Sequence, residues 1–80
     1  MENEFKTYLS DQNLSKNTIT SYLYAIRQFE AKYDKLSKQN LRDYKVYLIE
    51  HYKPQTVNLR IRAINCYLES IQKEQWKLPS

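Results

Sequence analysis

The chain has 80 residues, a formal net charge of +4 and no glycine. A chain of this length forms one small domain with a marginal core, so most of its apolar residues must be used for packing. No stretch approaches the ~20 apolar residues that a membrane-spanning helix needs, and the lone Cys66 excludes an internal disulfide. The opening Met-Glu-Asn-Glu lacks the character of a signal peptide, so we expect a cytoplasmic protein.

Helix start signals divide the chain into four predicted helices. The first covers about Glu2 to Ser10, and the second follows Ser15, whose side-chain oxygen can cap the free N–H groups of the first turn. Ser37 precedes the third helix in the same way, and that helix runs to about residue 52. Pro54 suits the first turn of the fourth helix, which we expect to end near Gln75. These signals and the composition predict an all-α bundle.

Apolar residues recur at helical spacing in the predicted helices and indicate the core. The expected core positions are Phe5, Tyr8, Leu9, Ile19, Tyr22, Leu23, Ile26, Phe29, Tyr33, Leu41, Tyr44, Leu48, Tyr52, Val57, Ile61, Ile64, Tyr67, Leu68 and Ile71. Packing therefore explains most of the tyrosines, whereas Tyr24 points away from the apolar stripe.

Two segments share one plan, Thr18–Ile26 and Thr56–Ile64. Each begins with Thr and a β-branched residue, has an apolar residue at its sixth position and ends with Ala-Ile. Each lies in a run without a carboxylate, from Gln12 to Phe29 and from His51 to Leu68. Two helices with one apolar face and no negative charge on the other favour binding to a polyanion, although a merely solvated face is the simpler interpretation of either helix alone.

Residues opposite the apolar stripes are the candidate DNA contacts, because amides and hydroxyls can read base edges and cations bind phosphates. On the second predicted helix the candidates are Lys16, Asn17, Thr18, Thr20, Ser21 and Tyr24. On the fourth they are Gln55, Thr56, Asn58, Leu59, Arg60 and Arg62. Gln28 and Cys66 are expected on the same outward faces. The first-turn N–H groups at residues 16–18 and 54–56 also suit a phosphate.

Catalytic chemistry finds no support in this sequence. The carboxylates are scattered, and Cys66 and His51 have no metal-ligand companions, so we expect no catalytic residue, no metal and no cofactor. Besides DNA binding, two alternatives stay open. One is a helical protein-interaction module that associates independently of salt, and the other is a small helical transcription regulator that dimerises on a palindrome.

Three short motifs follow one another along the chain. They are Leu14-Ser15-Lys16-Asn17-Thr18-Ile19 followed by Tyr22, Ile26 and Phe29; Leu41-Arg42-Asp43-Tyr44 with Leu48; and Thr56-Val57-Asn58 with Ile61, Ala63, Ile64 and Tyr67. Their order and spacing, together with Leu78-Pro79 near the end, resemble the core-binding domain of the tyrosine recombinases, the phage-integrase and Xer-like group.

The resemblance implies an orthogonal, SAM-like bundle of four helices in residues 1–76, with residues 77–80 beginning a linker to a catalytic domain. It implies a domain that grips duplex DNA at a core site during DNA integration and recombination, with the second and fourth helices facing the major groove. Its partners would be double-stranded DNA, the catalytic domain of the same protein and other recombinase protomers. The fragment would not itself be an enzyme, because the family's catalytic residues lie downstream. A prokaryotic cytoplasmic protein, nucleoid-associated when bound, is expected.

The chain departs from the family pattern at several positions on these two helices. Leu23 and Tyr24 stand where basic residues are common, and Leu59 and Asn65 also replace common basic residues. We therefore expect fewer phosphate contacts, with Tyr24 and Leu59 touching thymine methyls or sugars. The fourth helix carries more charge and is expected to grip more strongly, while the second does more of the reading.

Overall fold

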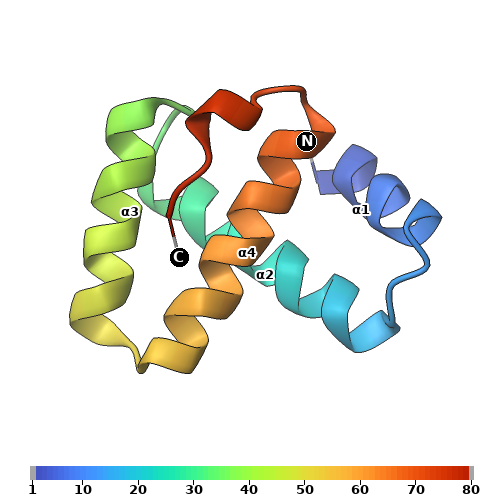
Figure 1. Ribbon diagram of the computed structural model, residues 1–80, viewed down its shortest axis with the longest axis horizontal. Coiled ribbons are helices and arrows are strands. Elements are labelled where there is room, and N and C mark those ends of the chain that lie inside the picture. The colour runs from blue at the N-terminus through green and yellow to red at the C-terminus, as the bar shows by residue number, and fades with distance from the viewer. Residues whose placement is uncertain (1, 80) are drawn as a thin grey trace.

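The computed structural model describes residues 2–79 and folds them into four α-helices and one short 3-10 helix (Figure 1). The helices are α1 (Glu2–Asp11), α2 (Lys16–Lys32), α3 (Lys38–His51) and α4 (Pro54–Ser70), and the 3-10 helix η1 covers Glu74–Trp76. No strand occurs in this part of the chain, so the predicted all-α bundle is confirmed. None of the helices within residues 2–79 is long and apolar enough to cross a membrane.

The helices begin where the sequence predicts. The Ser15 Oγ accepts a hydrogen bond from the backbone N–H of Thr18 at 3.2 Å. The Ser37 Oγ accepts one from the N–H of Asn40 at 3.1 Å. Both serines therefore act as N-caps, which satisfy backbone donors that have no partner inside the helix.

The end of α4 differs from the prediction, because the helix stops at Ser70 and does not continue to Gln75. Gln72 adopts a left-handed conformation with φ 61°, and its N–H donates to the carbonyl of Glu69 at 3.1 Å. The N–H of Lys73 donates to the carbonyl of Leu68 at 2.8 Å. This pair of hydrogen bonds is a common helix ending that normally has glycine at the left-handed position. The chain has no glycine, so the usual sequence signal for the end is missing.

The segment after η1 lies against the bundle. Leu78 is only 8% exposed and belongs to the core. The Asn65 amide donates to the carbonyl of Leu78 at 2.9 Å and accepts from its N–H at 2.8 Å. The Lys45 Nζ donates to the carbonyl of Pro79 at 2.6 Å. The residues expected to begin a linker are thus held on the bundle through Pro79, and Ser80 lies outside the described residues.

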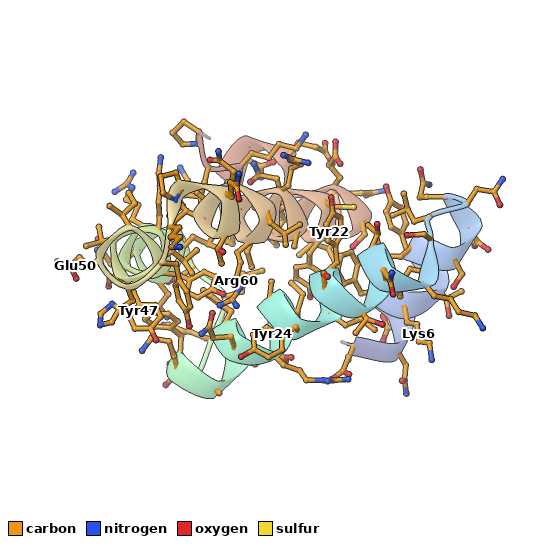
Figure 2. All side chains as sticks on the ribbon, turned by 90° about the horizontal axis from the view of Figure 1, so that it is seen from below. Lys6, Tyr22, Tyr24, Tyr47, Glu50 and Arg60 are labelled. Carbon is orange, nitrogen blue, oxygen red and sulfur yellow. The ribbon has the colours of Figure 1, made fainter. Side chains whose placement is uncertain are left out.

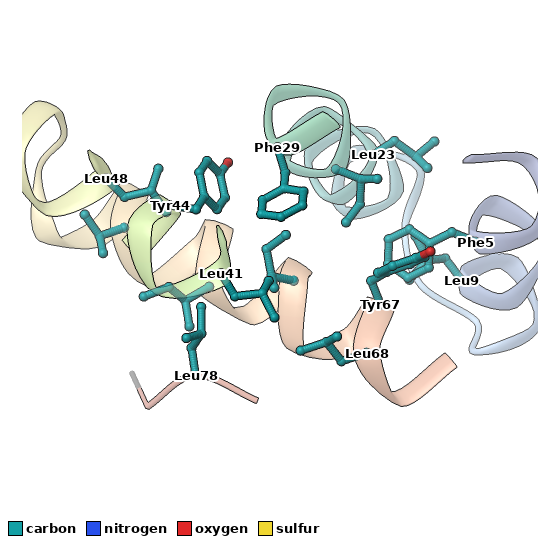
Figure 3. Close-up of a cluster of buried hydrophobic side chains, with 14 residues drawn as sticks. Phe5, Leu9, Leu23, Phe29, Leu41, Tyr44, Leu48, Tyr67, Leu68 and Leu78 are labelled. Atoms are coloured by element: carbon teal, nitrogen blue, oxygen red, sulfur yellow. The ribbon is translucent and has the colours of Figure 1, made fainter. Parts of the chain in front are cut away.

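The core runs along α4, which supplies more buried side chains than any other helix of the described chain. At one end Phe5 meets Tyr67 edge to face, with ring centroids 5.2 Å apart. At the other end Phe29 meets Tyr44 in the same way at 5.4 Å (Figure 3). Most predicted core positions are confirmed, while Tyr22 and Tyr52 are among those only partly buried.

The crossing of α2 and α4 forms the most extensive helix contact in the bundle. Ala25 and Ala63, which occupy equivalent places in the two matched segments, are both fully buried. Small side chains at such positions let two helices approach closely. The likeness of the two segments is therefore partly a packing requirement, and it places their outward faces next to each other.

Candidate nucleic-acid interface

An open groove of about 370 Å³ lies between α2 and α4. The residues that line it, all predicted as DNA contacts, are Thr20, Ser21, Tyr24, Thr56, Leu59 and Arg60. Figure 2 shows Tyr24 on α2 and Arg60 on α4 on the same face of the molecule. The lining contains hydroxyl groups, one cation and no carboxylate. We call this surface the α2/α4 groove.

Two apolar side chains of the α2/α4 groove are open to solvent. Tyr24 is 51% exposed and Leu59 is 37% exposed, in agreement with their predicted outward positions. An exposed apolar residue alone needs no explanation, but here one from each helix lines a common groove. The groove therefore combines hydrogen-bonding groups with apolar surface.

Arg60 is held in place by aromatic rings and an amide. Its Cζ lies 4.8 Å from the Tyr24 ring centroid and 4.4 Å from that of Tyr52. Its Nη1 donates to Oε1 of Gln28 at 2.6 Å. A guanidinium stacked on aromatic rings keeps its charge and loses conformational freedom. Arg60 thus carries a positive charge at a defined position in the wall of the groove.

Gln28 does not lie where the sequence predicts it. Its expected position was on the outward face of α2, but its amide lies partly buried and joins three side chains. Oε1 accepts from the Tyr44 hydroxyl at 2.7 Å as well as from Arg60, and Nε2 donates to the Tyr52 hydroxyl at 2.9 Å. The periodicity of α2 alone could not reveal this role, because the partners come from α3, its C-cap and α4.

Two tyrosines that bond to Gln28 have pKa values shifted in opposite directions, for different reasons. Burial raises the pKa of Tyr44. The Arg60 guanidinium, followed by the hydrogen bond from Gln28, lowers the pKa of Tyr52 below its ordinary value. A cation near a phenol favours the phenolate, so the shift at Tyr52 reflects the proximity of Arg60.

Several predicted contacts lie near the helix starts, outside the lining of the α2/α4 groove. Lys16 and Asn17 in the first turn of α2 are exposed, as are Gln55 and Asn58 on α4. Thr18 is half-buried, and its N–H is already taken by the Ser15 cap. The predicted phosphate site at the start of α2 therefore has one donor fewer.

The start of α4 has no side-chain cap. Lys53 occupies the N-cap position, and its side chain makes no capping hydrogen bond. The N–H groups of Gln55 and Thr56 belong to the first turn, where no carbonyl of the helix is available to them. They are consequently better suited to an external anion than those at the start of α2.

Arg62 lies apart from the α2/α4 groove. It lines a separate hollow of about 430 Å³, together with Tyr22, Cys66 and Glu69 among others. This hollow contains a carboxylate, unlike the α2/α4 groove. The structure therefore does not bring Arg60 and Arg62, the two arginines of the segment Thr56–Ile64, into one groove.

Cys66 also lines this separate hollow. Burial, followed by the charge of Glu69, raises the pKa of the Cys66 thiol, which does not favour a reactive thiolate.

Within residues 2–79 no cluster of three or more His, Cys, Asp or Glu residues could hold a metal ion. His51 is exposed at the end of α3.

The family model of the phage integrase N-terminal SAM-like domain matches residues 2–78. The chain belongs to this family. The match confirms the resemblance read from the three motifs and the predicted SAM-like bundle. The matched unit is the N-terminal domain of an integrase, which is distinct from the catalytic domain. No curated protein and no solved structure matches the chain significantly.

Proposed function

We propose that this integrase domain binds duplex DNA through the α2/α4 groove, as the core-binding part of a site-specific tyrosine recombinase. The observation that carries the proposal is the lining of that groove. Residues from two segments far apart in the sequence, all of them predicted DNA contacts, line one surface free of carboxylates. Family membership supports the same assignment.

The α2/α4 groove offers different contacts on its two sides. Thr20, Ser21 and Tyr24 on α2 present hydroxyl groups and a ring that can meet base edges and sugars. On α4, Arg60 supplies charge and Leu59 supplies apolar surface suited to a thymine methyl. The uncapped start of α4 adds N–H donors for a phosphate.

The rest of the protein's role follows from the same proposal. The domain acts as a binding module during DNA integration and recombination, and a catalytic domain of the same protein supplies strand cleavage. Residues 77–79 are the anchored beginning of the linker to that domain. Other recombinase protomers are partners in the DNA-bound assembly. A prokaryotic cytoplasmic location, on the nucleoid when DNA is bound, fits this role.

A matched pair of aliphatic substitutions tests the proposal. Leu59→Ser removes an exposed aliphatic side chain from the α2/α4 groove, and Ile49→Ser removes one of 58% exposure from α3. Anisotropy of a labelled duplex should give a wild-type Kd in the range of about 10⁻⁴–10⁻⁶ M at physiological salt. Leu59→Ser should weaken binding roughly fivefold, which corresponds to about 1 kcal/mol of lost apolar burial. Ile49 does not line the α2/α4 groove, so Ile49→Ser should change the Kd less than Leu59→Ser does.

Two results would contradict the proposal. Equal effects of both substitutions would mean that the α2/α4 groove is not the DNA surface. Failure of the wild-type chain to bind duplex DNA, combined with salt-independent association with a protein, would favour the interaction module.

A further inference from the structure

We infer that the domain carries a second surface for the DNA backbone, in a groove between α3 and the C-terminal segment. This groove has a volume of about 450 Å³ and is lined by four cations, Lys38, Arg42, Lys45 and Lys77, together with Trp76. No carboxylate is part of its lining. We call this surface the basic groove. It rests on the proposed function in one respect, which is that the domain binds DNA at all.

The cations of α3 are gathered on one side of the helix. Lys38, Arg42 and Lys45 follow one another at intervals of four and three residues, which places them on a common face. The acidic residues of α3, Asp43 and Glu50, are displaced around the helix from this face and do not line the groove. The separation gives the face a uniform positive charge.

The cations of the basic groove remain available to an anion. Lys38 and Arg42 are exposed, and neither forms an ion pair with a residue in the described range 2–79. Lys45 donates to the carbonyl of Pro79, which leaves its charge unneutralised. Lys77 pairs with Glu69 at 2.6 Å, but both side chains are substantially exposed and such a pair is weak. Lys77 can therefore exchange Glu69 for a phosphate.

The dimensions and chemistry of the groove suit a nucleic-acid strand. Lys38 and Lys45 are about 10 Å apart along the helix axis, given a rise of 1.5 Å per residue. Cations spread over this distance can contact more than one phosphate of a DNA backbone. Trp76 and Val46 add apolar surface to the lining, which can pack against the sugars of the backbone.

The basic groove lies on a different side of the domain from the α2/α4 groove. The two grooves have no lining residue in common. Figure 2 shows α4 between the C-terminal segment and α2. A duplex held in the α2/α4 groove would therefore leave the basic groove open to a backbone segment farther along the DNA or from another duplex.

A double substitution tests whether the cations of the basic groove contribute to DNA binding. Lys38→Gln with Arg42→Gln removes two positive charges from the basic groove, and Lys6→Gln with Lys35→Gln removes two charges outside both grooves. Binding of a long duplex should be measured by anisotropy over a range of salt concentrations. The slope of log K against log salt is negative, and the first variant should make it shallower by about 2, at roughly 0.9 per lost phosphate contact. The second variant should leave the slope nearly unchanged.

Trp76 provides a second, direct readout because it is the single tryptophan of the chain and lines the basic groove. Its fluorescence should change when duplex DNA is added to the wild-type chain, and Lys38→Gln with Arg42→Gln should abolish this change. Equal slopes for the two double variants, with an unchanged Trp76 signal, would overturn the inference. A Trp76 response to a poly-glutamate peptide but not to DNA would also overturn it, in favour of an acidic protein segment.

The two proposals fail in distinguishable ways. If the wild-type chain binds DNA, Leu59→Ser weakens binding and the basic-groove variant leaves the salt slope unchanged, only the second surface is wrong. If Leu59→Ser has no effect while the basic-groove variant abolishes binding, the second surface stands and the α2/α4 groove is wrong.

Discussion

Gln28 joins the core of the domain to its candidate DNA surface. Its amide bonds to the buried Tyr44, to Tyr52 at the end of α3 and to Arg60 in the α2/α4 groove. Oε1 accepts from both Tyr44 and Arg60, and arginine can only donate, so the orientation of the amide is determined by its partners. The position of Arg60 is consequently a property of the whole network.

Replacing Gln28 by Leu should destabilise the domain. The change removes the 2.7 Å hydrogen bond from the Tyr44 hydroxyl to Gln28 and leaves that hydroxyl only its longer bond to the carbonyl of Ala25, at 3.3 Å. Loss of one such hydrogen bond costs roughly 0.5–1.5 kcal/mol. Urea unfolding followed by circular dichroism measures the difference. Gln12→Leu serves as a control, because Gln12 is exposed and its side chain makes no hydrogen bond to another residue in the range 2–79. Equal stability of the two variants would show that the network contributes nothing.

The acidity of Tyr52 should respond to Arg60. The guanidinium favours the phenolate and lowers the pKa of Tyr52, so Arg60→Gln should raise that pKa toward its ordinary value. Because a lower pKa means deprotonation at lower pH, Tyr52 should titrate before the buried Tyr44 in the wild type and closer to an ordinary tyrosine in the variant. Two-dimensional NMR of the tyrosine rings against pH separates these residues. An unchanged pKa would contradict the stacked position of Arg60.

At the scale of the helix, starts were predictable and one end was not. Ser15 and Ser37 have side-chain oxygens that can cap a helix, so they mark the starts of α2 and α3. Pro54 has a fixed backbone angle that suits the first turn of α4. The end of α4 depends on the left-handed conformation of Gln72, which the sequence does not predict because glycine is the usual residue at such a position. The helical periodicity continues to Ile71, so apolar spacing alone extends the prediction too far.

Gln72→Gly should stabilise the domain. A left-handed conformation costs an L-residue about 1–2 kcal/mol, and glycine avoids this cost while losing about 0.5–1 kcal/mol through backbone entropy. The expected net gain is therefore several tenths of a kcal/mol to about 1 kcal/mol, measured by thermal or urea unfolding. Ala31→Gly, at an exposed position within α2, should instead lose about 1 kcal/mol. A loss at Gln72 equal to that at Ala31 would contradict the left-handed conformation.

At the scale of the whole molecule, the sequence predicted which faces point outward but not which of them meet. Thr20, Tyr24 and Leu59 follow from helical periodicity, and the crossing of α2 and α4 at buried alanines brings them into one groove. Arg62 satisfies the same periodicity and lies on another surface. The basic groove was not predicted, because Trp76 and Lys77 come to lie beside α3 only when the chain turns at Gln72 and Leu78 packs into the core.

The central claim, that the α2/α4 groove is the DNA surface, is tested most directly by NMR titration of the ¹⁵N-labelled chain with duplex DNA. The amide signals of Thr20, Ser21, Tyr24, Thr56 and Leu59 should shift together with one apparent Kd, and the shifts should diminish as salt is raised. Changes confined to α1 and α3, with these amides unmoved at saturating DNA, would contradict the claim.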